Sequence, residues 1–165
     1  MHINTVGRDG RLIVIVLDSD SPNTGRVRHY AREFITKHLS GDDLAALVMT
    51  GVDAGDWVFT SDKSVLLTGV ESFSGGLPGR VIHTLKSVAN HLAPIRGRRK
   101  VLVLFSQGFG CEVDESLDCP DNPTLSTDVR EAIGAITRAG VSIYPVDIRG
   151  LTGPRDEAIT EPPIS

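Results

Sequence analysis

One stretch near the start of the chain constrains the fold more than any other feature. Residues 12–17 are apolar without a break, and two carboxylates, Asp18 and Asp20, follow directly. A short run that is apolar at every position is typical of a strand buried on both faces, as in the centre of a parallel sheet. Ligands of open α/β sheets bind just outside the carboxyl ends of the strands. We therefore expect a functional site of this protein to contain Asp18 and Asp20.

Along the rest of the chain, apolar runs alternate with segments whose apolar residues recur at helical spacing. Further strands are expected at residues 44–49, 57–59, 101–105 and 141–146. Helices are expected to begin at Asn23 or Thr24, at Thr60 or Ser61, near Val81, and at Ser126 or Thr127. Strands that alternate with helices are joined by right-handed crossovers, which makes the sheet mainly parallel. The sequence thus predicts a doubly wound, Rossmann-like α/β domain.

Two features predict the edges of this sheet. The run at residues 57–59 is very short, which is typical of an edge strand, here a short antiparallel one. Pro145 lies inside the last predicted strand. Because proline has no N–H to donate to a neighbouring strand, the strand that contains it is expected at an edge of the sheet.

The composition is that of an ordinary soluble domain and argues against several partners. The 165 residues suffice for one domain with a core, and 40% of them are hydrophobic and 23% charged. A net charge of −4 argues against nucleic acid and anionic membrane surfaces as partners. No apolar stretch is long enough to span a bilayer, and the first ten residues lack the apolar segment of a signal peptide. The basic cluster at residues 96–100 directly precedes a predicted strand and is interpreted as its solvated lead-in.

Five stretches together resemble a known family. They lie at residues 12–18, 41–48, 59–62, 98–108 and 139–147. In this order they resemble a von Willebrand factor type A (vWA) domain, and most of all its divergent bacterial, VWFA-related branch. The resemblance implies a vWA-type domain over residues 10–151, followed by a polar, proline-rich tail at 152–165. The family's sixth strand and last helix have no counterpart here, so one explanation is a domain truncated within a longer chain.

Members of the family that this chain resembles bind a divalent cation at a metal-ion-dependent adhesion site. The first motif of that site is Asp-x-Ser-x-Ser, and the matching residues here are Asp18, Asp20 and Pro22, so only the leading Asp is kept. A Thr of the family falls in the stretch Gly75-Gly76-Leu77. An Asp of the family, in a Ser-Asp-Gly setting, falls on Gln107.

These departures remove most of the expected metal ligands. Neither Pro22 nor Leu77 offers a side-chain oxygen, and Gln107 offers a carbonyl without charge. We therefore expect a degenerate adhesion site and no cofactor. The alternative is an altered, weak Mg²⁺ site made by Asp18, Asp20 and Ser106, because hard cations prefer oxygen ligands. A plainer interpretation of Asp20 is that it caps the turn and the helix that follows.

The resemblance implies a protein-interaction module, not an enzyme, with a protein partner that docks over the ends of the strands. The surface expected to bind that partner consists of Ser21, Asn23, Gly76, Leu77, Gln107 and Phe109. The alternative is a phosphoryl-transfer enzyme of haloacid-dehalogenase type that uses Asp18 and Asp20. That chemistry needs a downstream lysine, and no lysine follows Lys100. A purely structural domain of a longer chain is a third possibility.

Cys111 and Cys119 are the only cysteines, and both fall in the long loop at residues 107–125. Paired, they would close a small loop in an oxidising compartment. Metal binding is not expected, because two thiols without a nearby His do not make a metal site. The cellular compartment stays open on these residues, and the family resemblance slightly favours one outside the cytoplasm.

Overall fold

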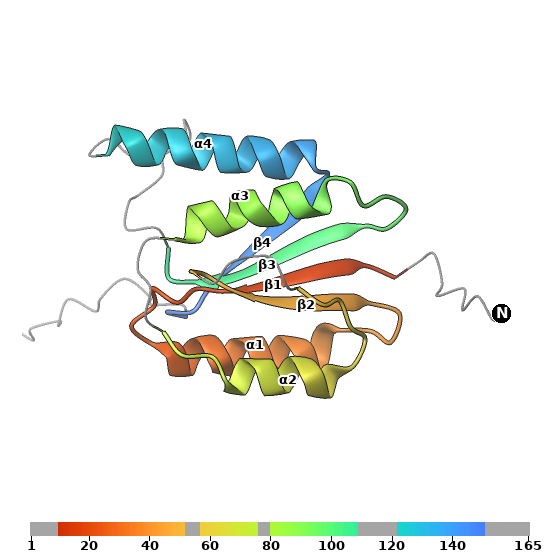
Figure 1. The fold of residues 1–165 in the computed structure, drawn as a ribbon. Coiled ribbons are helices and arrows are strands. Elements are labelled where there is room, and N and C mark those ends of the chain that lie inside the picture. Colours follow the sequence, from red (N-terminus) through yellow and green to blue (C-terminus); the bar gives the residue numbers. More distant parts are fainter. Residues whose placement is uncertain (1–9, 52–56, 76–79, 109–121, 151–165) are drawn as a thin grey trace, which may run out of the picture.

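The computed structural model describes residues 10–51, 57–75, 80–108 and 122–150. Its elements follow in the order β1 (Leu12–Leu17), α1 (Thr24–His38), β2 (Leu44–Met49), α2 (Lys63–Glu71), α3 (Val81–Leu92), β3 (Lys100–Ser106), α4 (Pro123–Arg138) and β4 (Val141–Asp147). The strands form one sheet between two layers of helices, with α1 and α2 on one face and α3 and α4 on the other (Figure 1). The predicted α/β architecture is therefore confirmed.

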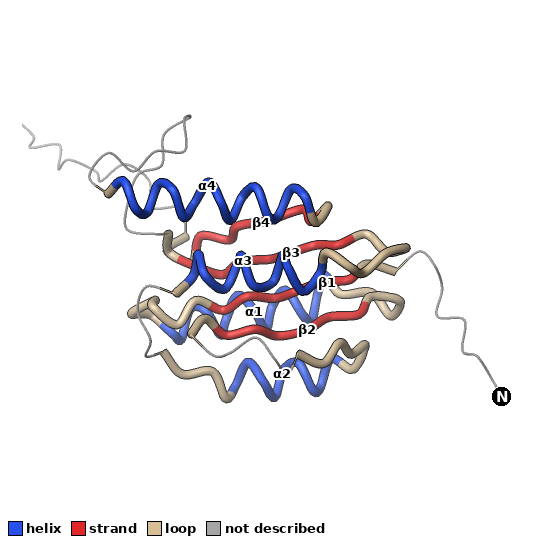
Figure 2. The backbone as a smooth tube through the Cα atoms, turned by 45° about the horizontal axis from the view of Figure 1, so that its top comes forward, coloured by secondary structure: helices blue, strands red, loops and turns tan. Residues whose placement is uncertain are grey.

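All pairings between these strands are parallel, and the strand order is β2-β1-β3-β4. Figure 2 shows the four strands side by side, with β2 and β4 at the two edges. β1 pairs with both β2 and β3, so its six residues are buried throughout. This central position explains why the β1 sequence is apolar at every residue instead of alternating.

The two faces of β1 belong to two separate cores. Leu12, Val14 and Val16 pack with the residues of α3 and α4. Ile13, Ile15 and Leu17 pack with the residues of α1 and α2. Successive side chains of a strand point to opposite faces of its sheet, so one continuous apolar run supplies both cores.

The antiparallel edge strand predicted at residues 57–59 is wrong. Within the described residues, this segment makes only one isolated antiparallel bridge, between Thr60 and Ala45, with both N–H···O distances at 2.9 Å. Trp57 and Phe59 pack against the core on the side of α3 and α4. Asp62 already caps α2 by accepting from the Ser64 N–H, so no length remains for a strand.

The helix starts differ from the sequence prediction at two of four places, and α3 begins at Val81 as predicted. Asn23 caps α1 as expected and accepts from the Arg26 N–H. The cap of α2 is Asp62, not Thr60 or Ser61. The cap of α4 is Asn122, not Ser126 or Thr127, and Pro123 follows it directly. Proline's fixed φ suits the first turn of a helix, which explains why α4 begins earlier than its apolar spacing indicates.

Pro145 lies in β4, and β4 is an edge strand, as predicted. The Ile148 N–H donates to the Ser106 carbonyl at 3.2 Å. Because N–H groups alternate in direction along a strand, residue 145 directs its backbone nitrogen to the opposite, open side. The missing N–H of Pro145 therefore leaves the pairing between β3 and β4 intact.

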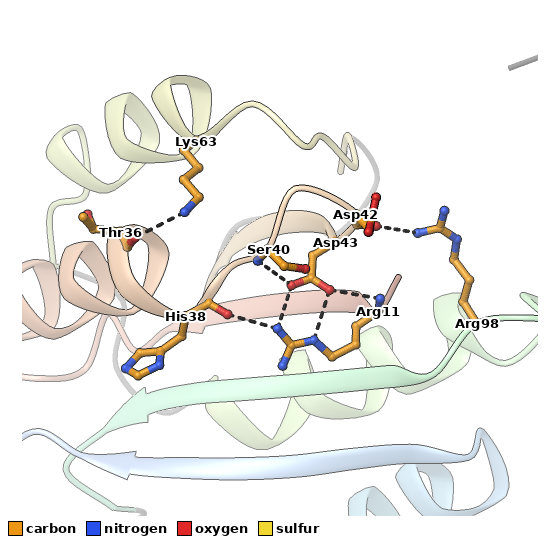
Figure 3. Close-up of polar contacts among 8 residues, drawn as sticks. All are labelled: Arg11, Thr36, His38, Ser40, Asp42, Asp43, Lys63 and Arg98. Carbon is orange, nitrogen blue, oxygen red and sulfur yellow. Dashed lines mark hydrogen bonds and ion pairs between the residues drawn. The ribbon is translucent and has the colours of Figure 1, made fainter. Parts of the chain in front are cut away.

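An ion pair fixes the amino end of the sheet (Figure 3). The Arg11 guanidinium donates to both oxygens of Asp43, at 3.0 Å from Nε and 2.6 Å from Nη2. The Arg11 and Ser40 backbone N–H groups donate to the same carboxylate at 3.0 and 2.8 Å. Arg11 also donates to the His38 carbonyl. The entry to β1, the end of α1 and the entry to β2 are thereby held together.

Candidate functional site

Asp18 directly follows β1 and is almost completely buried, with 1% of its surface exposed. Its Oδ2 accepts from the Ser106 hydroxyl at 2.6 Å, and its Oδ1 accepts from the Asp20 backbone N–H at 3.0 Å. Ser106 belongs to the end of β3, the neighbour of β1. The carboxyl ends of two adjacent parallel strands thus bring together two of the residues that the sequence predicted for the site.

The position of Asp18 raises the pKa of its carboxyl group. The main cause is burial, which disfavours the charged form, and the hydrogen bond from Ser106 opposes this effect. The hydrogen bond from the Asp20 N–H opposes it as well. A buried carboxylate of this kind needs its internal donors, because an unsatisfied charge in such a place is costly.

Ser106 also shapes the turn that follows β3. Its Oγ accepts from the Gly108 N–H at 3.1 Å while its hydroxyl proton goes to Asp18. Gly108 has a φ of 106°, in the region that favours glycine. Gln107, between them, is half-buried. The Ser-x-Gly arrangement therefore links the Asp18 carboxylate to the conformation of the β3 exit.

Ser19 and Thr50 join the exits of β1 and β2, a contact that the sequence analysis missed. The Ser19 N–H donates to Thr50 Oγ1 and the Ser19 hydroxyl donates to the Thr50 carbonyl, both at 2.7 Å. Both residues are buried. The available signal was the position of Thr50 directly after the predicted strand 44–49, at the same edge of the sheet as Asp18.

The β1–α1 loop is in close contact with the segment that follows α2. A Cβ atom added to Gly75 would lie 2.8 Å from the Thr24 methyl group and 3.2 Å from the Ser19 carbonyl oxygen. Within the loop, the Ser21 hydroxyl oxygen accepts from the Asn23 N–H at 3.2 Å. A side chain at position 75 would push the two segments apart, so glycine is required for their packing.

The six residues predicted to bind a partner have different positions. Asn23 is exposed at the start of α1, and Gln107 is half-buried at the β3 exit. Ser21 is buried, so its side chain does not contribute to the surface. Gly76, Leu77 and Phe109 lie outside the described residues, as do Cys111 and Cys119.

A second group at this end of the sheet connects β4 to α1. Arg149 makes a two-pronged ion pair with Asp147, the last residue of β4. Arg26 of α1 donates to the Arg149 carbonyl at 2.8 Å. This pair lowers the pKa of Asp147, chiefly through the hydrogen bond from the Arg149 side chain. The arginine neutralises the Asp147 carboxylate at the end of β4, which β3 separates from β1.

The donors for a divalent cation are few in the described part of the chain. Asp18 and Ser106 lie together, and Asp20 follows on an exposed turn. Pro22, two residues after Asp20, brings no side-chain oxygen. No group of three or more His, Cys, Asp or Glu side chains that could hold a metal ion occurs among the described residues. The donor set fits an ordinary divalent-cation site poorly.

Comparisons with known proteins place the fold and nothing finer. No protein-family model matches this chain, and no curated protein matches it. Twenty-eight chains of solved structures match it, among them an aerotolerance-related membrane protein from Bacteroides fragilis with multiple mutations to serines. That match has a TM-score of 0.51 and 14% sequence identity, and it covers 82% of this chain and 66% of the other. None of the helices described in the present structure is long and apolar enough to cross a membrane. The chain thus shares its parallel α/β fold with the aerotolerance-related protein and spans slightly less than two thirds of that protein's length.

Proposed function

We propose that this chain is a vWA-like protein-interaction domain that binds a protein partner over the carboxyl end of its sheet, without a cation at Asp18. The observation that carries the proposal is the burial of Asp18 together with its hydrogen bonds to the chain itself. One carboxylate oxygen accepts from Ser106 and the other from the Asp20 N–H, and the side chain is 1% exposed. The charge that would hold a cation in a vWA domain is here engaged with the chain itself.

The neighbouring residues support a cation-free surface. The Ser21 hydroxyl accepts from the Asn23 N–H inside the loop, and its side chain is buried. Pro22 and Asn23 are exposed at the turn, and Asp20 is exposed beside them. Loops at this end of an α/β sheet are the usual place for binding. The similarity to the aerotolerance-related protein supports the fold that the proposal needs.

Calorimetric titration tests the cation-free part. Mg²⁺ and Mn²⁺ are titrated into the wild-type chain, into Asp18→Ala and into Asp42→Ala, a matched change of an exposed carboxylate at the opposite end of the sheet. We expect no saturable heat from any of them at millimolar metal. Saturable binding that disappears in Asp18→Ala and persists in Asp42→Ala would instead establish the weak Mg²⁺ site.

Site-specific photo-crosslinking tests the partner surface. A photoreactive amino acid replaces Gln107 at the β3 exit or, as a control, Asn90, an exposed residue of α3. We expect one protein partner to crosslink from position 107 and not from position 90. Asn23→Asp and Gln107→Arg should then weaken binding of that purified partner. The fold of Asn23→Asp should be kept, because Asp still caps α1. Unchanged binding by both variants would reject the surface.

The phosphoryl-transfer alternative lacks a supporting observation. A nucleophilic Asp18 would have to reach substrate, yet it is 1% exposed. Lys100, the last lysine of the chain, donates to the Leu92 and Ala139 carbonyls at 2.9 and 2.7 Å, next to the start of β3 and away from its Ser106 end. We expect no hydrolysis of p-nitrophenyl phosphate with Mg²⁺ present. Hydrolysis that Asp18→Asn abolishes would restore the enzymatic alternative.

A further inference from the structure

One face of β4 is left uncovered by the described helices. α1 packs over β1 and β3, α2 packs over β2, and α4 packs on β4 from the other face of the sheet. On the side of α1, Tyr144 is 49% exposed and Val146 is only partly buried. In an α/β domain, both faces of a parallel sheet are normally covered. This face of β4 therefore lacks a covering segment among the described residues.

A groove of about 440 Å³ occupies the uncovered position. Val101 and Val103 of β3, with Val146 of β4, supply apolar side chains to it, and Tyr144 and Phe34 line it as well. The volume lies within the range of about 300–1,000 Å³ that is typical of binding clefts. The groove is separate from the Asp18 loops, because its lining extends toward the amino end of the sheet.

Two arginines and a histidine line the amino end of the groove. Arg11 and Arg99 precede β1 and β3, and His38 ends α1. Arg11 is engaged with Asp43. Arg99 is exposed, and its guanidinium makes no hydrogen bond or ion pair with other described residues. An occupant of the groove would therefore gain most from carboxylates placed near Arg99.

We propose that residues 151–165 of this chain bind in the groove and cover the open face of β4. The sequence 151–165 contains three acidic residues and one arginine, a net charge of 1 − 3 = −2. It also contains Leu151, Ile159 and Ile164, which suit the apolar floor. It follows Gly150 directly, just beyond the carboxyl end of the strand that it would cover. Charge, apolar content and point of attachment thus agree with one occupant.

The distances allow this placement. Arg99 lies one residue before Lys100, which is paired with Val141, so the path from Val146 to the level of Arg99 spans six residues of strand. At about 3.3 Å per residue this is about 20 Å. Asp156 and Glu161 are six and eleven residues beyond Gly150, and an extended chain spans up to about 20 and 36 Å over those lengths. Because Gly150 lies beyond Val146, the full path is longer than this, so Glu161 can reach Arg99 with length to spare, whereas Asp156 is at the limit.

Backbone NMR of the full chain and of a chain that stops after Gly150 tests the proposal. If residues 151–165 occupy the groove, the amide resonances of Val101, Val103 and Tyr144 differ between the two chains. Those of Val14 and Val48, which face the other core, coincide. Spectra that coincide everywhere beyond the immediate neighbours of Gly150 would overturn the proposal. Groove resonances that move with protein concentration would indicate a second copy as the occupant and overturn it too.

Charge variants in the full chain give a second, independent test. Replacing the tail carboxylates together (Asp156→Asn, Glu157→Gln, Glu161→Gln) cannot remove a core contact of the described domain. It should move the groove resonances toward those of the shortened chain, whereas Arg155→Gln should not. Arg99→Glu should act like the shortening, and Arg96→Glu, an exposed arginine outside the groove lining, should have no effect. Equal effects of Arg99→Glu and Arg96→Glu would refute the specific pairing.

Discussion

Replacing Asp43 by Asn should destabilise the domain more than any other single change of an acidic side chain to its amide in the described part. The carboxylate accepts four hydrogen bonds, two at Oδ1 from the Arg11 backbone N–H and Nε, and two at Oδ2 from Arg11 Nη2 and the Ser40 N–H. Its side chain is 2% exposed. An Asn can accept the first two bonds with its carbonyl, but its NH₂ group would then face two donors.

The size of the effect follows from these contacts. Removing one partner of a buried ion pair costs about 3–5 kcal/mol. The Arg11 side chain is 38% exposed, so water can solvate the guanidinium once the carboxylate charge is gone, which reduces the loss. We expect a decrease in the free energy of unfolding of about 2–3 kcal/mol, or about 5–10 °C in Tm for a domain of this size.

The pH dependence has a definite sign. The Arg11 guanidinium lowers the pKa of Asp43 well below its usual range, mainly through their hydrogen bond. A carboxyl group with a lowered pKa stabilises the fold above its unfolded-state pKa, near 4, and this contribution is lost as the pH falls toward the folded-state pKa. The wild-type chain should lose stability below about pH 4, and Asp43→Asn should lose less over the same interval.

Urea unfolding between pH 2.5 and 7, monitored through the fluorescence of Trp57, measures both effects. Trp57 is the only tryptophan, and its ring lies 4.9 Å from that of His91. Asp42→Asn is the matched control, because this neighbouring side chain is exposed. It should change the free energy of unfolding by less than about 0.5 kcal/mol. An equally small change in the free energy of unfolding of Asp43→Asn would refute the reasoning. The Arg11–Asp43 contact would then contribute no more than an ordinary surface ion pair.

Three further changes test other parts of the structure. Ser106→Ala removes a donor from buried Asp18, so it should raise the pKa of Asp18 further and lower stability at pH 7 by about 1–3 kcal/mol; denaturant unfolding at pH 5 and 7 should show the larger loss at pH 7. Gly75→Val should separate the β1–α1 loop from the segment after α2, visible as faster amide exchange of Ser19 and Ser21, and Ser74→Val, at an exposed neighbour, should not. Lys100→Met should lower the free energy of unfolding by about 1–2 kcal/mol, because Lys100 satisfies carbonyls at the ends of both α3 and α4; an unchanged urea midpoint would contradict that role.

The sequence predicted the centre of the fold because the signals there are local. An unbroken apolar run such as that of β1 has one main structural explanation, and Pro145 indicated an edge strand through its missing N–H. Asn23 is a suitable helix cap, and it directly precedes a segment whose apolar residues recur at helical spacing. Parallel topology placed Asp18 and Ser106 at the same edge of the sheet, and their contact arises because β1 and β3 are neighbours.

Other features depended on long-range contacts that a linear pattern does not contain. Residues 57–59 have strand-like composition, but the partly buried rings of Trp57 and Phe59 pack against the core, and the cap of α2 follows at Asp62. Arg11 and Asp43 are 32 positions apart, and nothing local marks them as partners. Ser19 and Thr50 likewise meet only because β1 and β2 end side by side. The burial of Ser21 also required the folded loop.

The two ends of the strand order bear on how the protein behaves at high concentration. Open sheet edges template intermolecular strand pairing, the first step of amyloid-like aggregation. Here, Thr60 occupies the outward N–H and C=O of Ala45 on β2, and Pro145 interrupts the row of donors on β4. A Pro145→Val variant would keep every described bond between β3 and β4 and complete the outer donor row. We therefore expect this variant to form β-rich assemblies without a loss of stability. Natural selection can act on this property without any change in the folded domain.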